Sequence, residues 1–124
     1  MATPFMIPVY TTRGDVGAMF IYPYLFSRQG EWIGWVTPDR QVYSVHGHYA
    51  GQLSNEPRIL RRQSDAYDRP RRKPPVAPRT VIPPATFPLA PLMAELTFGM
   101  VDVLQDSPDL LPPVDFGDLR EDME

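Results

Sequence analysis

The residue types and spacing with the clearest capacity for chemistry are those of the pair His46-x-His48. Two imidazoles placed close together can bind a metal ion, but a complete site needs further ligands. The two histidines flank Gly47, a residue type typical of turns. We therefore expect both side chains to be solvent-exposed turn residues, and the sequence predicts no metal site.

Other groups that support catalysis are scarce. The chain has no cysteine, so a thiol nucleophile, a thiolate metal site and a disulfide framework are all excluded. No G-x-S-x-G motif occurs, and a serine triad would depend on one of the same two histidines. Most carboxylates lie in the run DSPDLLPPVDFGDLREDME, a composition typical of a solvated segment. The sequence thus predicts no catalytic residue, no cofactor and no enzymatic activity.

A cluster of arginines is the strongest candidate for binding. Residues 61–88 carry seven Lys and Arg against two Asp and Glu, whereas residues 89–124 carry one against nine. Arginines beside aromatic side chains can contact phosphates and stack on bases. The net charge of −3 argues against a nucleic-acid partner, and the two oppositely charged segments can also neutralise each other. The basic candidate residues are Arg69, Arg71, Arg72 and Lys73.

A repeat in the N-terminal half of the chain predicts the secondary structure that positions the histidines and arginines. Three segments align without a gap: VYTTRGDVGAMF (9–20), LFSRQGEWIGWV (25–36) and VYSVHGHYAGQL (42–53). Their period, near 16 residues, is too short for a helical repeat and fits one β-hairpin plus a connector. Three hairpins that turn at the shared glycines, Gly14, Gly30 and Gly47, are therefore predicted.

The predicted turn also sets the faces of each hairpin. A two-residue type I′ turn at Gln29-Gly30 places Ser27 opposite Trp32 and Leu25 opposite Gly34. Opposed residues share a face, so Trp32 and its equivalent Tyr49 should be buried in the core, and Glu31 and His48 should be exposed. The other face carries an aromatic column that we expect to be half covered at best: Tyr10, Phe26 and Tyr43.

A fourth hairpin would begin at Ile59 and Leu60, one period after Val42 and Tyr43, but no glycine turn follows at the expected place. We expect the stretch RRQSDAYDRPRRKPP to form an enlarged loop. Part of PPVAPRTVI would then return as an edge strand, where proline is tolerated. The 16 prolines are unevenly distributed and crowd between Arg69 and Pro91, a stretch that cannot form a helix or a central strand.

The units GEWIGWV and GHYAGQL, with the third repeat leading into PRIL, resemble the 4-fold β-flower domain family. The resemblance covers residues 8–62. It implies a small rosette of four β-hairpins, and it carries no known biochemical role and no catalytic residues. The missing fourth turn departs from the pattern of the family.

The C-terminal stretch APLMAELTFGMVDVLQD (90–106) predicts one helix of about four turns, because apolar residues recur at helical spacing after Pro91. Apolar residues on more than one side of this helix favour a second subunit as their cover. We expect a dimer or a larger even assembly. The candidate interface residues are Leu92, Leu96, Phe98, Met100, Val101 and Val103.

These expectations combine into a mainly β fold, a pseudo-symmetric rosette or small barrel of β-hairpins with a Pro-rich segment and one C-terminal helix. Residues 1–62 form the hairpin domain, 63–88 a Pro/Arg-rich loop or linker, and 89–124 the helix and acidic tail. No leader-like start and no long apolar run is present, which favours a soluble cytoplasmic protein without a membrane partner. The predicted function is a non-enzymatic structural or protein-interaction module that self-associates. Nucleic-acid binding through the arginines is the alternative, and the Pro-rich run can also act as a polyproline II ligand for another protein.

Overall fold

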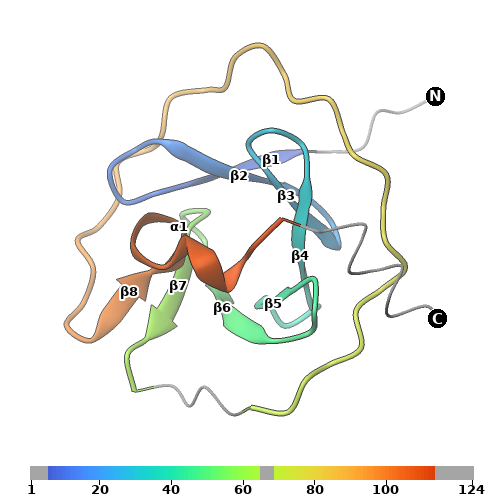
Figure 1. Cartoon of the computed structure of the whole chain (residues 1–124). Coiled ribbons are helices and arrows are strands. Elements are labelled where there is room, and N and C mark those ends of the chain that lie inside the picture. The colour runs from blue at the N-terminus through green and yellow to red at the C-terminus, as the bar shows by residue number, and fades with distance from the viewer. Residues whose placement is uncertain (1–5, 65–68, 114–124) are drawn as a thin grey trace.

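Residues 6–64 and 69–113 are described by the computed structural model, and within them the chain forms one antiparallel sheet of eight strands. Each strand pairs with the next along the chain, and the sheet curls around a central core (Figure 1). The mainly β fold expected from the sequence is therefore confirmed. The strands are β1 (Ile7–Tyr10), β2 (Val16–Ile21), β3 (Tyr24–Ser27), β4 (Trp32–Val36), β5 (Gln41–Ser44), β6 (Tyr49–Leu53), β7 (Ile59–Arg62) and β8 (Met100–Asp102).

The three predicted hairpins turn at the expected glycines, but the form of the turn differs from the prediction. The amide of Gly30 donates to the Ser27 carbonyl (2.9 Å), and the amide of Ser27 donates to the Glu31 carbonyl (2.6 Å). The loop is thus a tight turn followed by a glycine bulge at φ +91°, one residue longer than a type I′ turn. The Ser27 hydroxyl stabilises this longer loop because it accepts the Glu31 amide (3.1 Å).

The bulge moves one side chain to the other face of the sheet. Leu25 lies opposite Gly34 as predicted, but Phe26, not Ser27, lies opposite Trp32. Trp32 is buried as expected, although it joins Phe26 in a cluster on the outer face, and Ile33 takes its place in the central core. The exposure predicted for Glu31 and His48 is confirmed by the structure, whereas Tyr49 is only half-buried.

Two glycines of the hairpin strands lie where the backbones of neighbouring strands are crowded. A Cβ atom built on Gly34 would come within 2.4 Å of the Tyr43 carbonyl oxygen on the next strand. A Cβ atom on Gly51 would come within 2.8 Å of the Leu60 carbonyl oxygen. Strands β4 and β6 therefore pack against their neighbours more closely than any larger residue would permit.

The fourth hairpin has its first strand where the sequence places it, but its second strand comes from much farther along the chain. Strand β7 pairs with β8, in which Arg61 lies opposite Val101. The edge strand predicted within PPVAPRTVI is wrong, because residues 69–98 contain no strand. Proline cannot donate to a sheet ladder, and β8 supplies three residues without proline.

The predicted four-turn helix over residues 90–106 is also wrong. Within the described residues only α1 (Val103–Asp106) is an α-helix, and a 3₁₀ turn, η1 (Pro108–Leu110), follows it. Gly99 has φ +86°, which a helix interior does not allow. The open edge of β7 takes Met100–Asp102 as its partner, so tertiary pairing overrides the helical spacing of the apolar residues.

The C-terminal segment fills the centre of the rosette. Helix α1 lies in the middle of Figure 1, and Val103 is fully buried in the central core together with Leu111 of the following segment. Leu104 lies so close to Gly17 that a Cβ atom there would come within 2.9 Å of a Leu104 methyl carbon. Side chains of the segment after β8 thus fill the space inside the curled sheet.

A buried carboxylate links the two ends of the sheet, where β1 and β8 do not pair. Asp102 is fully buried and accepts hydrogen bonds from the Thr12 amide (2.7 Å) and the Thr12 hydroxyl (2.6 Å). It also accepts from the Gln105 amide (3.3 Å) as the N-cap of α1. The Arg58 guanidinium donates to the same Thr12 hydroxyl (3.1 Å). These contacts join the first turn to the last strand.

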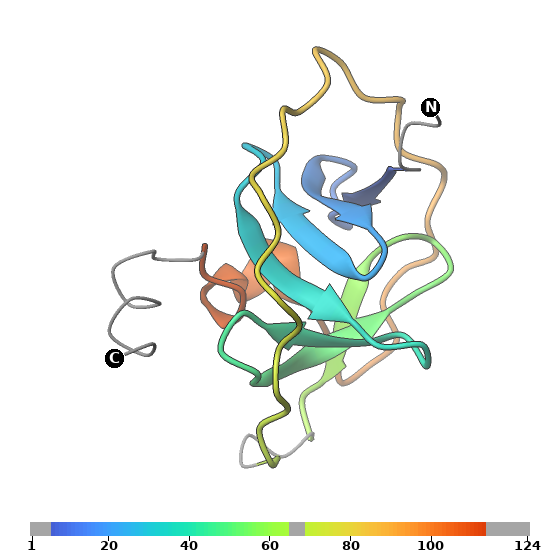
Figure 2. The same cartoon turned by 90° about the vertical axis from the view of Figure 1, so that its right-hand side faces the viewer.

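Residues 69–98, named the belt below, run around the outside of the sheet without forming a helix or a strand. In Figure 1 the belt encircles the hairpins, and Figure 2 shows it passing in front of the strands. The belt covers the outer face, which we had expected to be half covered at best. The aromatic column of that face is accordingly buried: Tyr10, Phe26 and Tyr43.

Candidate interaction surface on the belt

The belt is fastened to the hairpin turns at regular intervals. The amide of Arg72 donates to the Gly47 carbonyl (3.0 Å), and the amide of Val81 donates to the Gly30 carbonyl (3.1 Å). Nine residues farther on, Ala90 lies against Gly14, with 3.8 Å between its Cβ atom and the position of a Cβ built on the glycine. The belt therefore meets the three turns in reverse order, once every nine residues.

Tyrosine hydroxyls hold the belt between these points. Tyr24 donates to the Val76 carbonyl (2.7 Å), and Tyr10 donates to the Pro88 carbonyl (2.8 Å). Carbonyl groups of a proline-rich chain are left available for such bonds, because no regular secondary structure uses them. Two tyrosines of the sheet thus fix a segment that has no hydrogen-bond ladder of its own.

Apolar belt side chains also pack inward. Val81 and Phe87 cover the outer cluster of the sheet, which consists of Met19, Phe26, Trp32 and Val45. Burial of large apolar side chains is worth about 1.5–3 kcal/mol each, so these contacts add to the few hydrogen bonds of the belt. Apolar side chains thus help to hold the belt against the outer face of the sheet.

The outward side of the belt is apolar as well. Of the six large hydrophobic residues that are exposed among the described residues, five lie on the belt. Leu89 is 95%, Leu92 103% and Phe98 106% exposed relative to a free residue. Single exposed apolar residues are ordinary, but five of them along one segment make the belt the candidate interaction surface of this chain. The five residues are Val76, Ile82, Leu89, Leu92 and Phe98.

The apolar residues predicted as an interface do not share one helical face. Leu92 and Phe98 are fully exposed on the belt, and Leu96 is half-buried. Met100 and Val101 are half-buried in β8. Val103 belongs to the central core and is not available to a partner. The structure thus leaves only part of the predicted interface on the surface.

The predicted basic residues lie together at the start of the belt, where they contact the sheet. The Arg69 guanidinium carbon lies 3.9 Å from the ring centre of Tyr49, and that of Arg72 lies 5.5 Å from the ring centre of Tyr43. Arg71 donates to the His46 carbonyl through Nε (2.9 Å) and Nη2 (2.6 Å). Lys73 is exposed. Three of these four cations therefore help to attach the belt.

The arginines also influence one nearby carboxyl group. The Thr37 hydroxyl donates a hydrogen bond to Asp39 and holds the pKa of that carboxyl below its usual range. Desolvation of the carboxyl opposes this effect, and the positive charge of Arg72 makes the smallest of the contributions that lower the pKa. Asp39 therefore keeps its negative charge beside the start of the belt.

The two histidines of the sequence motif lie at the third hairpin turn. The His46 and His48 amides donate to the Ser44 hydroxyl at 3.3 and 3.2 Å, as the Gln29 and Glu31 amides donate to Ser27 in the second turn. His48 is exposed as expected, whereas His46 is half-buried. In residues 6–64 and 69–113 no three His, Asp or Glu side chains come together in a group that could hold a metal ion. Within the same ranges, no helix has the length and apolar character to cross a membrane.

Comparison with protein-family models, curated proteins and solved structures finds no match. The assignment of a function to this chain consequently rests on its own residues and geometry.

Sequence reasoning missed three of the outward apolar residues: Val76, Ile82 and Leu89. The sequence nevertheless contains a usable indication. Each lies among prolines, where neither a helix nor a central strand can form, and such a segment cannot bury every apolar side chain it carries. What the sequence lacks is the direction of each side chain, because the anchors at the turn glycines decide it.

Proposed function

We propose that this protein is a non-enzymatic interaction module that self-associates through the outward apolar side chains of the second half of the belt. The observation that carries the proposal is the full exposure of Leu89, Leu92 and Phe98 on an ordered segment. The four-hairpin arrangement supports membership of the 4-fold β-flower family. In this proposal the assembly is soluble, cytoplasmic and even-numbered.

The energetics favour association at this segment. Each large apolar side chain that becomes buried contributes about 1.5–3 kcal/mol, and a two-fold axis uses each residue twice. Binding normally loses free energy when a mobile segment becomes ordered. The second half of the belt is already held by the hydrogen bond from Tyr10 to the Pro88 carbonyl and by that from the Ala94 amide to Glu56 (3.0 Å), so this loss is small. A symmetric pair of belts can therefore bury the exposed side chains at low cost.

The arginine geometry gives less support to nucleic-acid binding. Bases stack on exposed aromatic faces, and here the guanidinium groups of Arg69 and Arg72 lie over Tyr49 and Tyr43. The Nε and Nη2 atoms of Arg71 both donate to the His46 carbonyl of the same chain. The net charge of the chain is −3. We therefore favour a protein partner, in the first place a second copy of this chain.

Replacement of both Leu92 and Phe98 by Ser tests the proposal. Both side chains are fully exposed in the single chain, so the substitutions remove no internal contact that stabilises the fold. We expect light scattering to give an even multiple of 14.1 kDa for the natural chain and the monomer mass for the double variant.

Val76 and Ile82 provide a matched control, because they are exposed apolar residues on the first half of the belt. The corresponding double Ser variant should keep the mass of the natural chain. A natural chain that is monomeric would refute the proposal. Equal dissociation of both double variants would show that the contact is not confined to the second half of the belt.

A further inference from the structure

The burial of the belt residues follows a period of three. From residue 75 to residue 96 every third residue is half-buried, except that Pro83 is half-buried in place of Pro84. Three residues per turn is the geometry of a polyproline II helix, which proline-rich chains adopt without internal hydrogen bonds. One edge of this helix therefore lies against the sheet. We name it the inner edge, and its members are Pro75, Pro78, Val81, Phe87, Ala90, Met93 and Leu96.

A second edge of the belt faces solvent between residues 73 and 82, and cations alternate with apolar side chains along it. Val76 is 86% and Ile82 95% exposed, and Lys73 and Arg79 are exposed as well. Successive members of this series are about 9 Å apart, because a polyproline II helix rises about 3.1 Å per residue. We name these four residues the outer edge: Lys73, Val76, Arg79 and Ile82.

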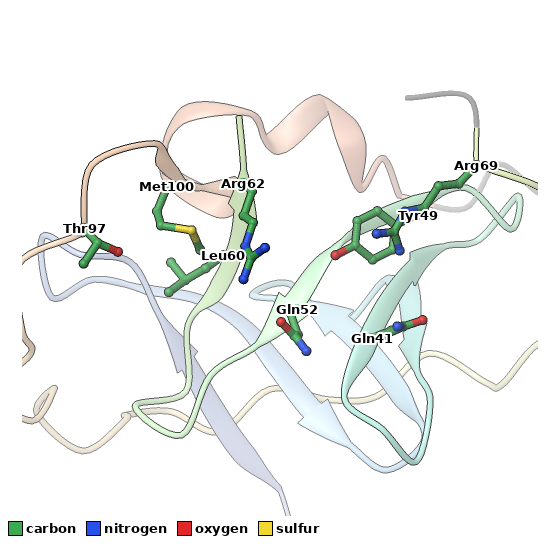
Figure 3. A pocket seen from close by; sticks show the side chains of 8 residues that line it. All are labelled: Gln41, Tyr49, Gln52, Leu60, Arg62, Arg69, Thr97 and Met100. Atoms are coloured by element: carbon green, nitrogen blue, oxygen red, sulfur yellow. The ribbon is translucent and has the colours of Figure 1, made fainter. Parts of the chain in front are cut away.

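Contacts with the sheet hold the outer edge in place. The Tyr24 hydroxyl donates to the Val76 carbonyl (2.7 Å), and the Val81 amide donates to the carbonyl of the second turn glycine (3.1 Å). Nearer the start of the belt, Arg69 lines a pocket between the two ends of the belt, and its side chain lies across the Tyr49 ring (Figure 3). The belt is therefore attached both before and along the outer edge, so the exposed side chains keep a fixed spacing.

The charge and the shape of the outer edge define the partner that fits it. Lys73 and Arg79 make no ion pair with any described residue, and residues 69–94 contain no Asp or Glu. A complementary surface must therefore supply carboxylates for the two cations. Grooves lined with aromatic side chains recognise polyproline II segments. The sheet of this chain holds the inner edge in a similar way, through tyrosine hydroxyls and an outer cluster that contains aromatic rings.

We propose that the outer edge docks, with the belt in place, into the groove of a polyproline-binding domain of the SH3 type that carries acidic side chains beside its aromatic residues. Val76 and Ile82 enter the groove, and Lys73 and Arg79 pair with the carboxylates. The belt loses little conformational freedom on binding, because its contacts with the sheet already fix this segment. The outer edge is separate from the second half of the belt, which we propose for self-association.

A free peptide of the same sequence offers a different binding motif. Arg72 is followed by Pro75 and Pro78 at the spacing of a P-x-x-P ligand. In the folded chain both prolines belong to the inner edge and are half-buried, so a domain that reads them must first detach the belt. Docking on the outer edge therefore predicts tighter binding of the folded chain than of the peptide, and recognition of the prolines predicts the reverse.

Titration calorimetry of the full chain with a panel of recombinant SH3 domains, chosen for acidic side chains beside the groove, tests the proposal. We expect at least one domain to bind saturably with a Kd below about 1 mM. Val76→Ser combined with Ile82→Ser should weaken this binding at least tenfold without unfolding the chain, because both side chains are almost fully exposed. The matched control is Leu92→Ser combined with Phe98→Ser, which lies outside the outer edge and should change the affinity less than twofold.

Three results would overturn the proposal. One is a full chain that binds no domain of the panel with a Kd below about 1 mM. Another is a synthetic peptide of residues 69–86 that binds more tightly than the full chain, since recognition would then depend on the prolines of the inner edge. The third is equal affinity of the two double Ser variants, since the apolar side chains of the outer edge would then make no specific contact.

Discussion

Replacement of Gly30 by Ala should destabilise the protein far more than the same change at Gly14. Both glycines have positive φ, +91° and +95°, so alanine is strained at either position by about 1–2 kcal/mol. Of these two glycines, Gly30 is the one that the belt approaches closely, because a Cβ atom there would lie 1.9 Å from the Val81 carbonyl oxygen. The belt must move away, at a further cost of about 1–3 kcal/mol.

The comparison of the two variants isolates the contact between the turn and the belt. At Gly14 the nearest atom to the added Cβ is the Ala90 Cβ, at an ordinary 3.8 Å. Urea unfolding, followed by the fluorescence of Trp32 and Trp35, measures the free energy of unfolding of each variant. Equal losses for Gly30→Ala and Gly14→Ala would mean that the belt does not lie against the second turn.

The second large effect should come from Asp102→Ala. The carboxylate is fully buried and accepts bonds from Thr12 and from the Gln105 amide, so its removal leaves buried donors without a partner. Loss of charged hydrogen bonds and of an N-cap each costs about 1–3 kcal/mol. We expect a loss of about 2–4 kcal/mol in the free energy of unfolding, since these contributions do not add fully.

Asp106→Ala is the control for this change, because Asp106 is an exposed acid of the same short helix. Its removal should alter the free energy of unfolding by no more than about 0.5 kcal/mol. Chemical denaturation of both variants provides the measurement. If Asp102→Ala were as stable as Asp106→Ala, the link between the first turn and the last strand would not stabilise the fold.

The part of the fold that sequence reasoning predicted well is local. Gly14, Gly30 and Gly47 mark turns because a positive φ favours glycine, and the apolar alternation beside them marks strands. The length of the loop was missed because the hydroxyl before each turn, as in Ser27, stabilises a longer loop than glycine alone indicates. One extra residue is enough to send Trp32 to the opposite face.

The part that was missed depends on contacts between distant segments. The residues from Leu92 to Val103 have helical spacing, and only the open edge of β7 explains why three of them become a strand. Gly99 was placed inside the predicted helix, although it has a positive φ like that of the three recognised turn glycines. The insertion between Arg62 and Gly99 hid the fourth hairpin from a search at a fixed period.

For the apolar residues and the arginines, sequence reasoning identified the residue types that gather in a segment but not how the fold arranges them. Leu92 and Phe98, predicted as interface residues, are exposed on the belt, but the predicted helix grouped them with Val103, which lies in the core. The arginines were recognised as a cluster, and their contacts with Tyr43 and Tyr49 depend on the path of the belt. Periodicity in a sequence cannot supply such a path, because a proline-rich chain can turn any of its sides toward the sheet.

Intermolecular paramagnetic relaxation tests most directly whether the second half of the belt joins two copies of this chain. Because the protein has no cysteine, a spin label on Glu95→Cys is unique, and Glu95 is exposed on that half of the belt. Mixed with the ¹⁵N-labelled natural chain, it should broaden the amide signals of Leu89, Leu92 and Phe98. A label on Arg79→Cys should leave these signals sharp. Broadening confined to the hairpin turns, or none in the mixed sample, would contradict self-association through the belt.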